Sequence, residues 1–319
     1  MSITLAALMA CGIAIPHVLP LRSAPPATAI ALWIASLLLR AVASVFAVLY
    51  LVLFLPQTQL FNAITHWCWH TVLPLVATHL GLDGHEIGDT AVVLPAVVLL
   101  ASGLSVGFGV MSAARSLRRL LRRHALGSGP EDSVIVGGSD VLLAAAGLVH
   151  PRIVVSAGAL TVLDDEELAA GLAHERGHIA RRHRYLLVLG AFSRATGCFV
   201  PGGRRALTAL GFHLERDADR FALRRHDRLA LASAICKAAT PQQFNFAYSG
   251  LGGSGVTERL RQLLDDQTHA HRKPLAAVLS GLAVAMIVLG LASAAVLPAT
   301  AYAGAEQVGQ TDAIRHCRT

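Results

Sequence analysis

Four long apolar stretches constrain the fold of this chain more than any other feature of its sequence. They are Ile3–Leu21, Ala31–Leu55, Ala91–Met111 and Leu275–Leu297. A helix needs about 20 consecutive apolar residues to cross the hydrocarbon core of a bilayer. Hydrophobic residues make up 54% of the chain and charged residues only 15%, which is too apolar for an ordinary soluble domain. The sequence therefore predicts a mainly α, multi-pass membrane protein with about four transmembrane helices.

The distribution of basic residues predicts how these spans are oriented. Lys and Arg are absent between Arg40 and Arg115, so the intervening loop, Gln57–Thr90, is expected on the exoplasmic side. Five arginines lie within 112–124, directly after the third stretch, and Arg272 and Lys273 precede the fourth. The segment between the third and fourth spans is therefore predicted to be cytoplasmic, in a bacterial cytoplasmic (inner) membrane, with the N-terminus exoplasmic.

The predicted spans divide the chain into four parts. These are an N-terminal membrane region, 1–112, with helices at about 3–21, 31–55 and 91–111; a cytoplasmic domain, 113–273; a fourth transmembrane helix, 274–298; and a short exoplasmic tail, 299–319. The first stretch has no basic residues before it and Arg22 follows it, so we expect a retained helix rather than a signal peptide. Arg40 falls inside the second stretch, and we expect its side chain to extend to the inner interface.

The net charge of +7 owes much to the arginines of Ser112–His124, which alternate with leucines. This pattern is typical of a basic amphipathic helix lying on anionic lipid. Nucleic-acid binding is not expected, because no DNA- or RNA-binding motif accompanies the charge. The lipid bilayer is the partner that the charge indicates.

The cytoplasmic segment is long enough for one compact α+β domain. Ser133–Val136 and Arg152–Val155 are short β-branched runs between turn residues and are predicted to be strands, whereas the Ala-rich Val141–Leu148 is predicted to be a short helix. One strand is a candidate for a sheet edge that accepts an extended peptide substrate, although an ordinary structural strand is the favoured interpretation. Its residues are Arg152, Ile153, Val154 and Val155.

The segment His174-Glu175-Arg176-Gly177-His178 carries the strongest chemical signal. Histidines at positions i and i+4 share one face of a helix, so both can bind one metal ion. Upstream, Asp164 is predicted to cap the helix and Glu167 to close a capping box, which places the two histidines in its middle. The alternative is a surface helix whose histidines face water.

A second helix predicted around Phe212–Asp219 offers a third ligand. Glu215 and Asp219 share one face of it, so Glu215 could bind the metal while Asp219 accepts a hydrogen bond from a ligand histidine. The alternative for this pair is a solvated acidic patch among arginines. His183 lies about 140° around a continuous helix from His178 and is expected on the surface.

Two histidines and a glutamate suit zinc best, so the sequence predicts one Zn²⁺ per chain and leaves manganese or cobalt open. Zinc held this way keeps one coordination position free for a water molecule, and Glu175 could take the proton of that water as catalytic base. This is the chemistry of peptide-bond hydrolysis. The sequence does not identify the group that stabilises the oxyanion; His213, His226 and several arginines are candidates.

Three segments together resemble the BlaR/MecR-type membrane metallopeptidases. They are Pro151–Gly158, Leu163–Leu168 and Ala173–Ile179. Members of that family place a cytoplasmic, zincin-like zinc peptidase domain between their third and fourth transmembrane helices. The resemblance covers about residues 90–270. It implies that His174, His178 and Glu215 bind zinc, that Glu175 is the catalytic base and that Asp219 supports a ligand from behind.

The resemblance predicts a zinc metalloendopeptidase in regulatory, signal-transducing proteolysis, with a protein substrate such as a cytosolic repressor. Beta-lactam sensing is not expected, because the chain has no Ser-x-x-Lys and only Pro298–Thr319 follows the last span. One alternative is an HtpX-like quality-control protease, since Gly252–Gly255 followed by Glu258-Arg259-Leu260 is similar to the post-catalytic segment of that group. A non-catalytic zinc-domain signal transducer is another.

Two exoplasmic features remain open in the sequence. Cys68 and Cys317 are both predicted outside and could form a disulfide. His66 and His70 could bind a metal, although Trp67 and Trp69 are more typical of interfacial anchors.

Overall fold

The computed structural model describes residues 3–54, 84–238, 249–250, 255–264, 278–290 and 292. Its helices are α1 (Ile3–Val18), α2 (Pro26–Phe54), α5 (Gly84–His124), α6 (Ala157–Val162), α7 (Asp165–Ala180), α8 (His183–Thr196), α9 (Gly203–Ala222), α10 (Arg228–Ala238), α11 (Val256–Leu264) and the helix Val278–Gly290. Single 3-10 turns, Leu21–Ser23 and Pro130–Asp132, lie between some of them.

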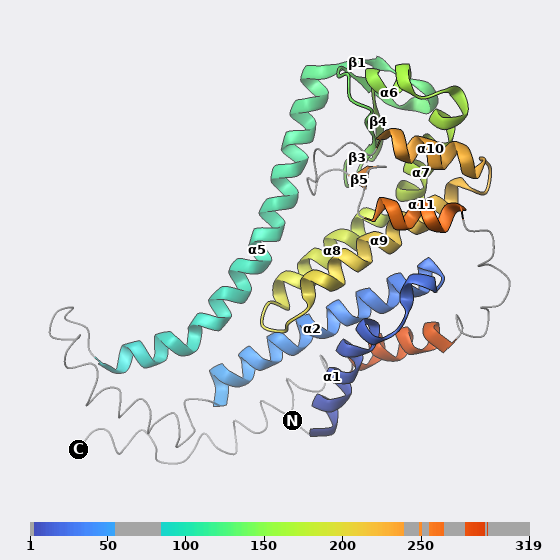
Figure 1. The fold of residues 1–319 in the computed structure, drawn as a ribbon. Coiled ribbons are helices and arrows are strands. Elements are labelled where there is room, and N and C mark those ends of the chain that lie inside the picture. Colours follow the sequence, from blue (N-terminus) through green and yellow to red (C-terminus); the bar gives the residue numbers. More distant parts are fainter. Residues whose placement is uncertain are drawn as a thin grey trace, which may run out of the picture.

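The strands form one sheet at the end of the molecule that is farthest from α1 (Figure 1). They are β1 (Ala125–Ser128), β2 (Val134–Val136), β3 (Leu143–Ala146), β4 (Arg152–Ser156) and β5 (Ser249–Gly250). Their order across the sheet is β1-β2-β4-β3-β5. The predicted strands Ser133–Val136 and Arg152–Val155 are confirmed as β2 and β4.

The structure corrects the predicted edge strand. β4 pairs in parallel with β2 and antiparallel with β3, so both of its edges carry backbone hydrogen bonds to neighbouring strands. An extended peptide therefore cannot add to Arg152, Ile153, Val154 or Val155, and that prediction is wrong. Three of these four residues also belong to the interior, because β4 is buried from Ile153 to Ser156 and only Arg152 is exposed.

The predicted helix Val141–Leu148 is also wrong, because Leu143–Ala146 form β3. β3 pairs antiparallel with both β4 and β5, and all four of its side chains are buried. Alanine has a high helix propensity, but propensity is a local preference that tertiary pairing overrides. Small side chains also allow α7 to lie close to this strand.

Two helices in the described part of the chain are long and apolar enough to cross a membrane. They are Pro26–Val52 within α2 and Val93–Arg119 within α5. α1 and the helix Val278–Gly290 are apolar but shorter. Two of the four predicted spans thus have the length and composition that a crossing requires, while the other two stay predictions.

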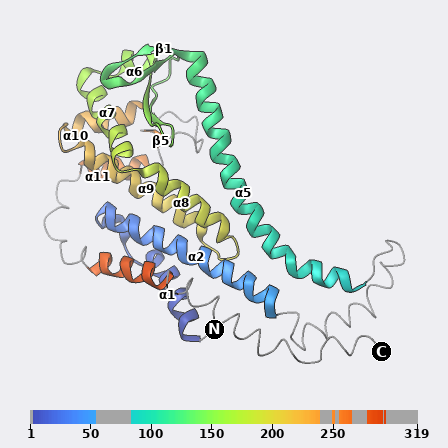
Figure 2. The same ribbon diagram turned by 180° about the vertical axis from the view of Figure 1, so that it is seen from behind.

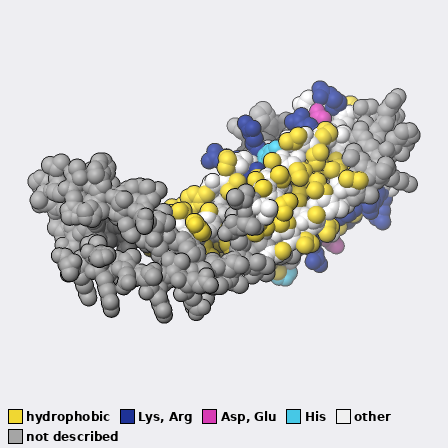
Figure 3. Space-filling model, turned by 90° about the horizontal axis from the view of Figure 1, so that it is seen from below, with side chains coloured by type: hydrophobic (Ala, Val, Ile, Leu, Met, Phe, Trp, Pro, Cys, Tyr) yellow, Lys and Arg dark blue, Asp and Glu magenta, His cyan; other side chains and the backbone are white. Residues whose placement is uncertain are grey.

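The long helix α5 stands beside the rest of the helices and reaches the sheet at its C-terminal end (Figures 1 and 2). Large apolar side chains along it are exposed, including Leu100, Leu104 and Phe108. Viewed from below, the described surface is largely hydrophobic across its middle, with Lys and Arg toward its margins (Figure 3). Exposed apolar surface on this scale is typical of contact with lipid or with another protein.

The helix α2 packs on the hairpin that α8 and α9 form, rather than standing apart from the segment 113–273 (Figure 1). Leu32 and Leu37 of α2 share one hydrophobic core with Ala206, Leu210 and Leu214 of α9, and all five side chains are almost completely buried. The helix Val278–Gly290 adds side chains to the same core. The chain segment before the sheet is therefore part of the support of α9.

Arg40 lies within this core and corrects another expectation. Its side chain is 2% exposed instead of extending to an interface. Its guanidinium donates to the Pro201 carbonyl oxygen (3.2 Å) and to Ser36, and one of its nitrogens is 2.8 Å from His17 Nε2. The Arg40 guanidinium thus has polar partners from α1, from α2 and from the turn between α8 and α9.

Several predictions fall on residues outside the described part of the chain. They are the loop that carries His66, Cys68 and His70, the tail that carries Cys317, and Gly252–Ser254 of the post-catalytic segment.

Candidate metal centre

The helix α7 begins where the sequence predicts and is held firmly at that end. The Asp164 carboxylate accepts from the Glu167 backbone N–H at 2.8 Å, and the Glu167 carboxylate accepts from the Asp164 N–H at 3.0 Å, so the predicted capping box is confirmed. Glu167 also accepts from Ser233 Oγ (2.5 Å) and Lys237 Nζ (2.6 Å) of α10. These contacts fix the axis of the helix that carries His174 and His178.

Helix α9 crosses α7 closely enough to bring its carboxylates to these histidines. A Cβ at Gly177 would be 3.2 Å from Ala218 Cα and 3.1 Å from Phe221 Cβ, so the helices could not approach as closely with a larger residue there. The close contact between α7 and α9 therefore requires glycine at position 177, just before His178. Glu215 and Asp219 of α9 are buried at this contact.

Three ligand atoms converge at the crossing. His174 Nε2 and His178 Nε2 are 3.2 Å apart, and each is 3.5 Å from a carboxylate oxygen of Glu215. Donors in a tetrahedral zinc site, with bonds of about 2.05 Å, are about 3.3 Å from one another. The three residues form a potential metal site of two imidazoles and one carboxylate, all buried.

Contacts on the far side of each imidazole leave its Nε2 free for a metal. His174 Nδ1 lies 2.9 Å from Asp219 Oδ1, an ion-pair distance at which the carboxylate favours a proton on Nδ1. His178 Nδ1 lies 3.0 Å from His183 Nδ1, and His183 Nε2 lies 3.2 Å from Asp217 Oδ2. If His183 donates to Asp217, its Nδ1 can accept from His178, which again leaves the Nε2 lone pair of His178 unprotonated.

The position of His183 corrects the sequence analysis. It was expected on the surface, yet it is 1% exposed and contacts a ligand histidine. The expectation assumed one continuous helix. α7 instead ends at Ala180 and α8 starts at His183, with Arg182 between them in a left-handed conformation (φ 55°). That break turns His183 back toward His178.

Arg259 is a further residue that the sequence analysis did not assign to the site. It is 1% exposed, donates to both carboxylate oxygens of Asp219 at 2.7 and 2.9 Å, and donates to Glu215 Oε2 at 2.9 Å. Burial disfavours the ionised carboxyls, but the Arg259 charge lowers the pKa of Glu215 to about 2 and that of Asp219 well below its usual range. The arginine thus keeps both carboxylates ionised and oriented inside the protein.

Glu175 lies on the same face of α7 as the ligands and is completely buried. Its Oε2 accepts from the backbone N–H of Ala145 in β3 at 2.6 Å, and its Oε1 has no partner among the described residues. Burial raises the pKa of Glu175 to about 8, and the neighbouring charges of His174 and Arg184 act in the opposite direction. A carboxylate that is held at one oxygen and free at the other is suited to proton transfer.

The charge of Arg184 acts on Glu175, and this arginine contacts none of the predicted ligands in the described part of the chain. It donates through Nη1 to the Gly147 carbonyl oxygen just after β3, while its buried Nη2 has no partner among the residues described. The other candidates for an oxyanion partner are placed differently. His213 is beside Arg216 (3.3 Å), which donates to the Ala24 carbonyl oxygen at the start of α2, and His226 follows the end of α9.

Comparison with known proteins agrees with this geometry. Residues 113–203 match peptidase family M48. This region contains the sheet strands β1 to β4 and both motif histidines, while Glu215 and Arg259 follow it. No curated protein matches the chain. The match supports a metal-dependent peptidase, and it does not distinguish the BlaR/MecR-type resemblance from other groups.

Proposed function

We propose that this protein is a membrane-bound zinc-dependent endopeptidase. The observation that carries the proposal is the buried cluster of His174, His178 and Glu215, with one unpartnered oxygen of Glu175 beside it. Ligand separations of 3.2 to 3.5 Å suit tetrahedral zinc, and both histidines have their Nδ1 occupied by other groups. The M48 match supports the peptidase class independently of this geometry.

Zinc held by these ligands would act as a Lewis acid toward the scissile carbonyl and the attacking water. Glu175 has the position of a general base: its Oε1 would take the proton of the water and pass it to the leaving amine, while Ala145 N–H holds Oε2 in place. We assign to Arg184 Nη2 the stabilisation of negative charge on the carbonyl oxygen, because it is a buried donor without a partner near Glu175.

The decisive experiment compares wild type, Glu175→Gln and Glu166→Gln in purified full-length protein. Glu166 lies on the same helix but is exposed, so its substitution is the matched control. We expect one zinc per chain in all three and cleavage of a casein-type substrate in wild type and Glu166→Gln only. Absence of zinc from wild type would overturn the metal site, and undiminished cleavage by Glu175→Gln would overturn the catalytic role of Glu175.

We further propose that the chain spans the bacterial inner membrane with the catalytic segment in the cytoplasm. The apolar lengths of α2 and α5 and the arginines after the apolar part of α5 support this orientation. Cys236 of α10 is exposed and offers a direct test. In a variant with Cys236 as its only cysteine, a membrane-impermeant maleimide should label the protein in lysed but not in intact spheroplasts. Labelling in intact spheroplasts would reverse the orientation.

A regulatory protease and an HtpX-like quality-control protease share this chemistry and differ in substrates. We favour regulatory proteolysis, in which a cytosolic repressor or another single protein is cleaved. Quantitative N-terminal proteomics of cells with wild type and Glu175→Gln distinguishes the two, because one or a few new N-termini indicate regulation and many indicate quality control. A zinc-domain transducer without catalysis predicts no difference between these strains, together with a preserved phenotype in Glu175→Gln.

A further inference from the structure

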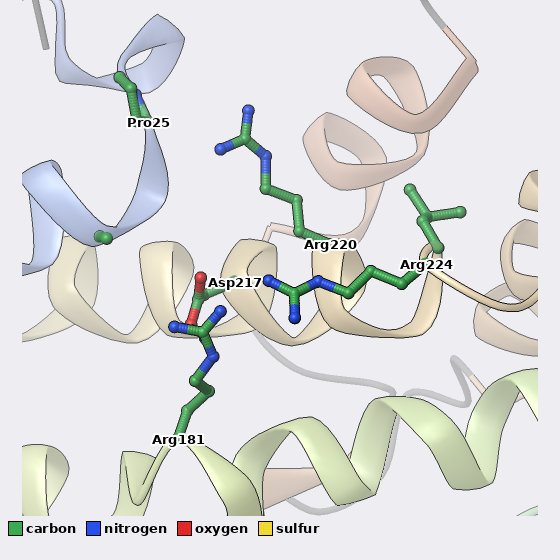
Figure 4. A pocket seen from close by; sticks show the side chains of 7 residues that line it. Pro25, Arg181, Asp217, Arg220 and Arg224 are labelled. Atoms are coloured by element: carbon green, nitrogen blue, oxygen red, sulfur yellow. The ribbon is translucent and has the colours of Figure 1, made fainter.

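A cavity of about 430 Å³ lies between the start of α2 and the C-terminal half of α9, outside the metal centre. Its lining includes Pro25 and Ala27 at the start of α2, Arg181 after α7, Asp217 and Arg220 of α9, and Arg224 just after α9 (Figure 4). Three guanidinium groups therefore meet one carboxylate around this space. No step of the proposed peptide hydrolysis uses Arg220 or Arg224.

The single carboxylate of the cavity is already engaged by other groups. Asp217 Oδ2 is 3.2 Å from His183 Nε2 and 3.8 Å from Arg181 Nε. In the part of the chain that the structure describes, no carboxylate lies within 4 Å of a guanidinium nitrogen of Arg220 or Arg224. The charge of Asp217 acts on Arg220 as well, and the Arg224 guanidinium lies over the Phe221 ring, 5.7 Å from its centroid. Three guanidinium groups thus share one carboxylate, and the net positive charge of the cavity attracts an anion.

The wall of the cavity that the start of α2 forms also favours an anion. α2 begins at Pro26, which has no N–H, and the backbone N–H groups of Ala27 and Thr28 have no partner within the helix. They carry partial positive charge and favour anions, above all phosphate. Arginine side chains bind phosphate oxygens in a two-pronged geometry that lysine cannot provide. The cavity is also within the usual size range of a small-molecule site.

We propose that this cavity binds a phosphate group, carried by the headgroup of an anionic phospholipid. The choice of a lipid rests on the proposed membrane location: α2, whose first residues line the cavity, is a candidate span, and Arg22 lies just before it at the corner between α1 and α2. Anionic headgroups gather at the cytoplasmic face, where basic residues attract them. Free inorganic phosphate has the same chemistry and is the other source that the test must distinguish.

The test measures lipid binding to delipidated full-length protein in neutral detergent by native mass spectrometry and fluorescence titration. The probes are short-chain phosphatidylglycerol, short-chain phosphatidylcholine and inorganic phosphate. The variant is Arg220→Gln/Arg224→Gln, with Arg224→Gln alone as a milder form. The control is Arg204→Gln/Arg205→Gln, which removes the same charge from exposed positions at the opposite end of α9, about 24 Å away along the helix.

We expect wild type and control to bind one phosphatidylglycerol, and the double variant to bind it at least tenfold more weakly, with Arg224→Gln between them. Equal affinity for inorganic phosphate would assign the site to free phosphate and overturn the lipid. Equal weakening in the control, or no binding in wild type, would overturn the site. Zinc content of the same samples reports folding and the metal centre separately, so failure of the proposed peptidase and failure of this site are distinguishable.

Discussion

At the scale of single residues, Arg259 allows the two buried carboxylates of the metal centre, Glu215 and Asp219, to remain ionised when no metal is bound. It donates to Asp219 and Glu215 inside the protein, where unpaired carboxylates are costly. Removal of one partner from a buried ion pair typically costs about 3–5 kcal/mol. Arg259→Met should therefore lower the melting temperature in detergent and weaken zinc binding by about 10–100-fold.

Arg259→Lys is the matched comparison for this prediction. It keeps the charge but cannot make the two-pronged contact with Asp219, so its melting temperature and zinc affinity should be intermediate. Chelator competition measures the affinity, and differential scanning fluorimetry measures the stability. Wild-type zinc affinity in Arg259→Met would show that the arginine does not position the ligands.

His183 should influence the metal through His178. When His183 Nδ1 accepts a hydrogen bond, the proton of His178 is on its own Nδ1, and the lone pair of His178 Nε2 is free for the metal. His183→Leu removes this partner and strands Asp217, so zinc affinity should fall by about 10–100-fold, with catalysis at saturating zinc reduced much less. His183→Gln, which retains a side-chain acceptor, should recover part of the affinity. Equal affinities of wild type and His183→Leu in chelator competition would contradict this chain of contacts.

At the scale of elements, Glu167 joins α7 to α10 and makes stability depend on pH. Burial alone would raise the pKa of Glu167, but hydrogen bonds from Lys237 and Ser233 lower it overall. Its contribution to the free energy of unfolding is therefore present above its unfolded-state pKa, about 4.3, and is lost as pH falls through the lower folded-state value. Glu167→Gln should cost about 1–2 kcal/mol at pH 7.

The measurement for Glu167 is the unfolding midpoint of wild type, Glu167→Gln and the exposed control Glu166→Gln from pH 7 down to pH 3. The difference between wild type and Glu167→Gln should shrink below about pH 4, because the wild-type carboxyl then also becomes neutral. Glu166→Gln should differ little from wild type at any pH. A deficit that is the same at every pH would mean that the ion pair contributes nothing to stability.

Elements defined by local pattern could be predicted from the sequence, and elements defined by distant contacts could not. The capping residues Asp164 and Glu167 and the β-branched run of β4 act within a few residues, and they appear as expected. β3 became a strand only because β4 and β5 pair with it. The break at Arg182, which brings His183 to the metal centre, has no helix-breaking residue to announce it.

In the candidate site, too, residues that belong to a local pattern could be predicted, and residues brought in by distant contacts could not. The motif histidines and Glu175 could be identified from their spacing, and Glu215 and Asp219 from a second helix face, and the structure brings these five residues together. Arg259 is 40 residues from Asp219 in the chain, and only folding shows which of the many arginines pairs with it. The sequence signal that could have pointed to Arg259 was the similarity of Glu258-Arg259-Leu260 to the post-catalytic segment of HtpX-like proteases.

At the scale of the whole molecule, one hydrophobic core contains residues from both sides of the predicted domain boundary at residue 113. Leu210 and Leu214 of α9 are buried in the same core as α2 residues, and they precede Glu215 by five residues and by one residue. Burial of two leucines contributes about 3–6 kcal/mol, which is comparable with the net stability of many domains. The position of the metal ligands on α9 thus depends on residues that precede the sheet by about a hundred positions.

The fragment 113–273 expressed alone should therefore fail to form the metal centre. We expect it to aggregate or to bind zinc far more weakly than the full chain, because the α9 face that α2 covers would be exposed to water. Co-expression of residues 1–112 as a separate chain is the control, and it should restore both solubility in detergent and one zinc per fragment. Size-exclusion chromatography with metal analysis measures both quantities. A monomeric, water-soluble fragment that binds one zinc with full affinity would show that the catalytic segment is an independent domain and that its packing on α2 only attaches it to the membrane helices.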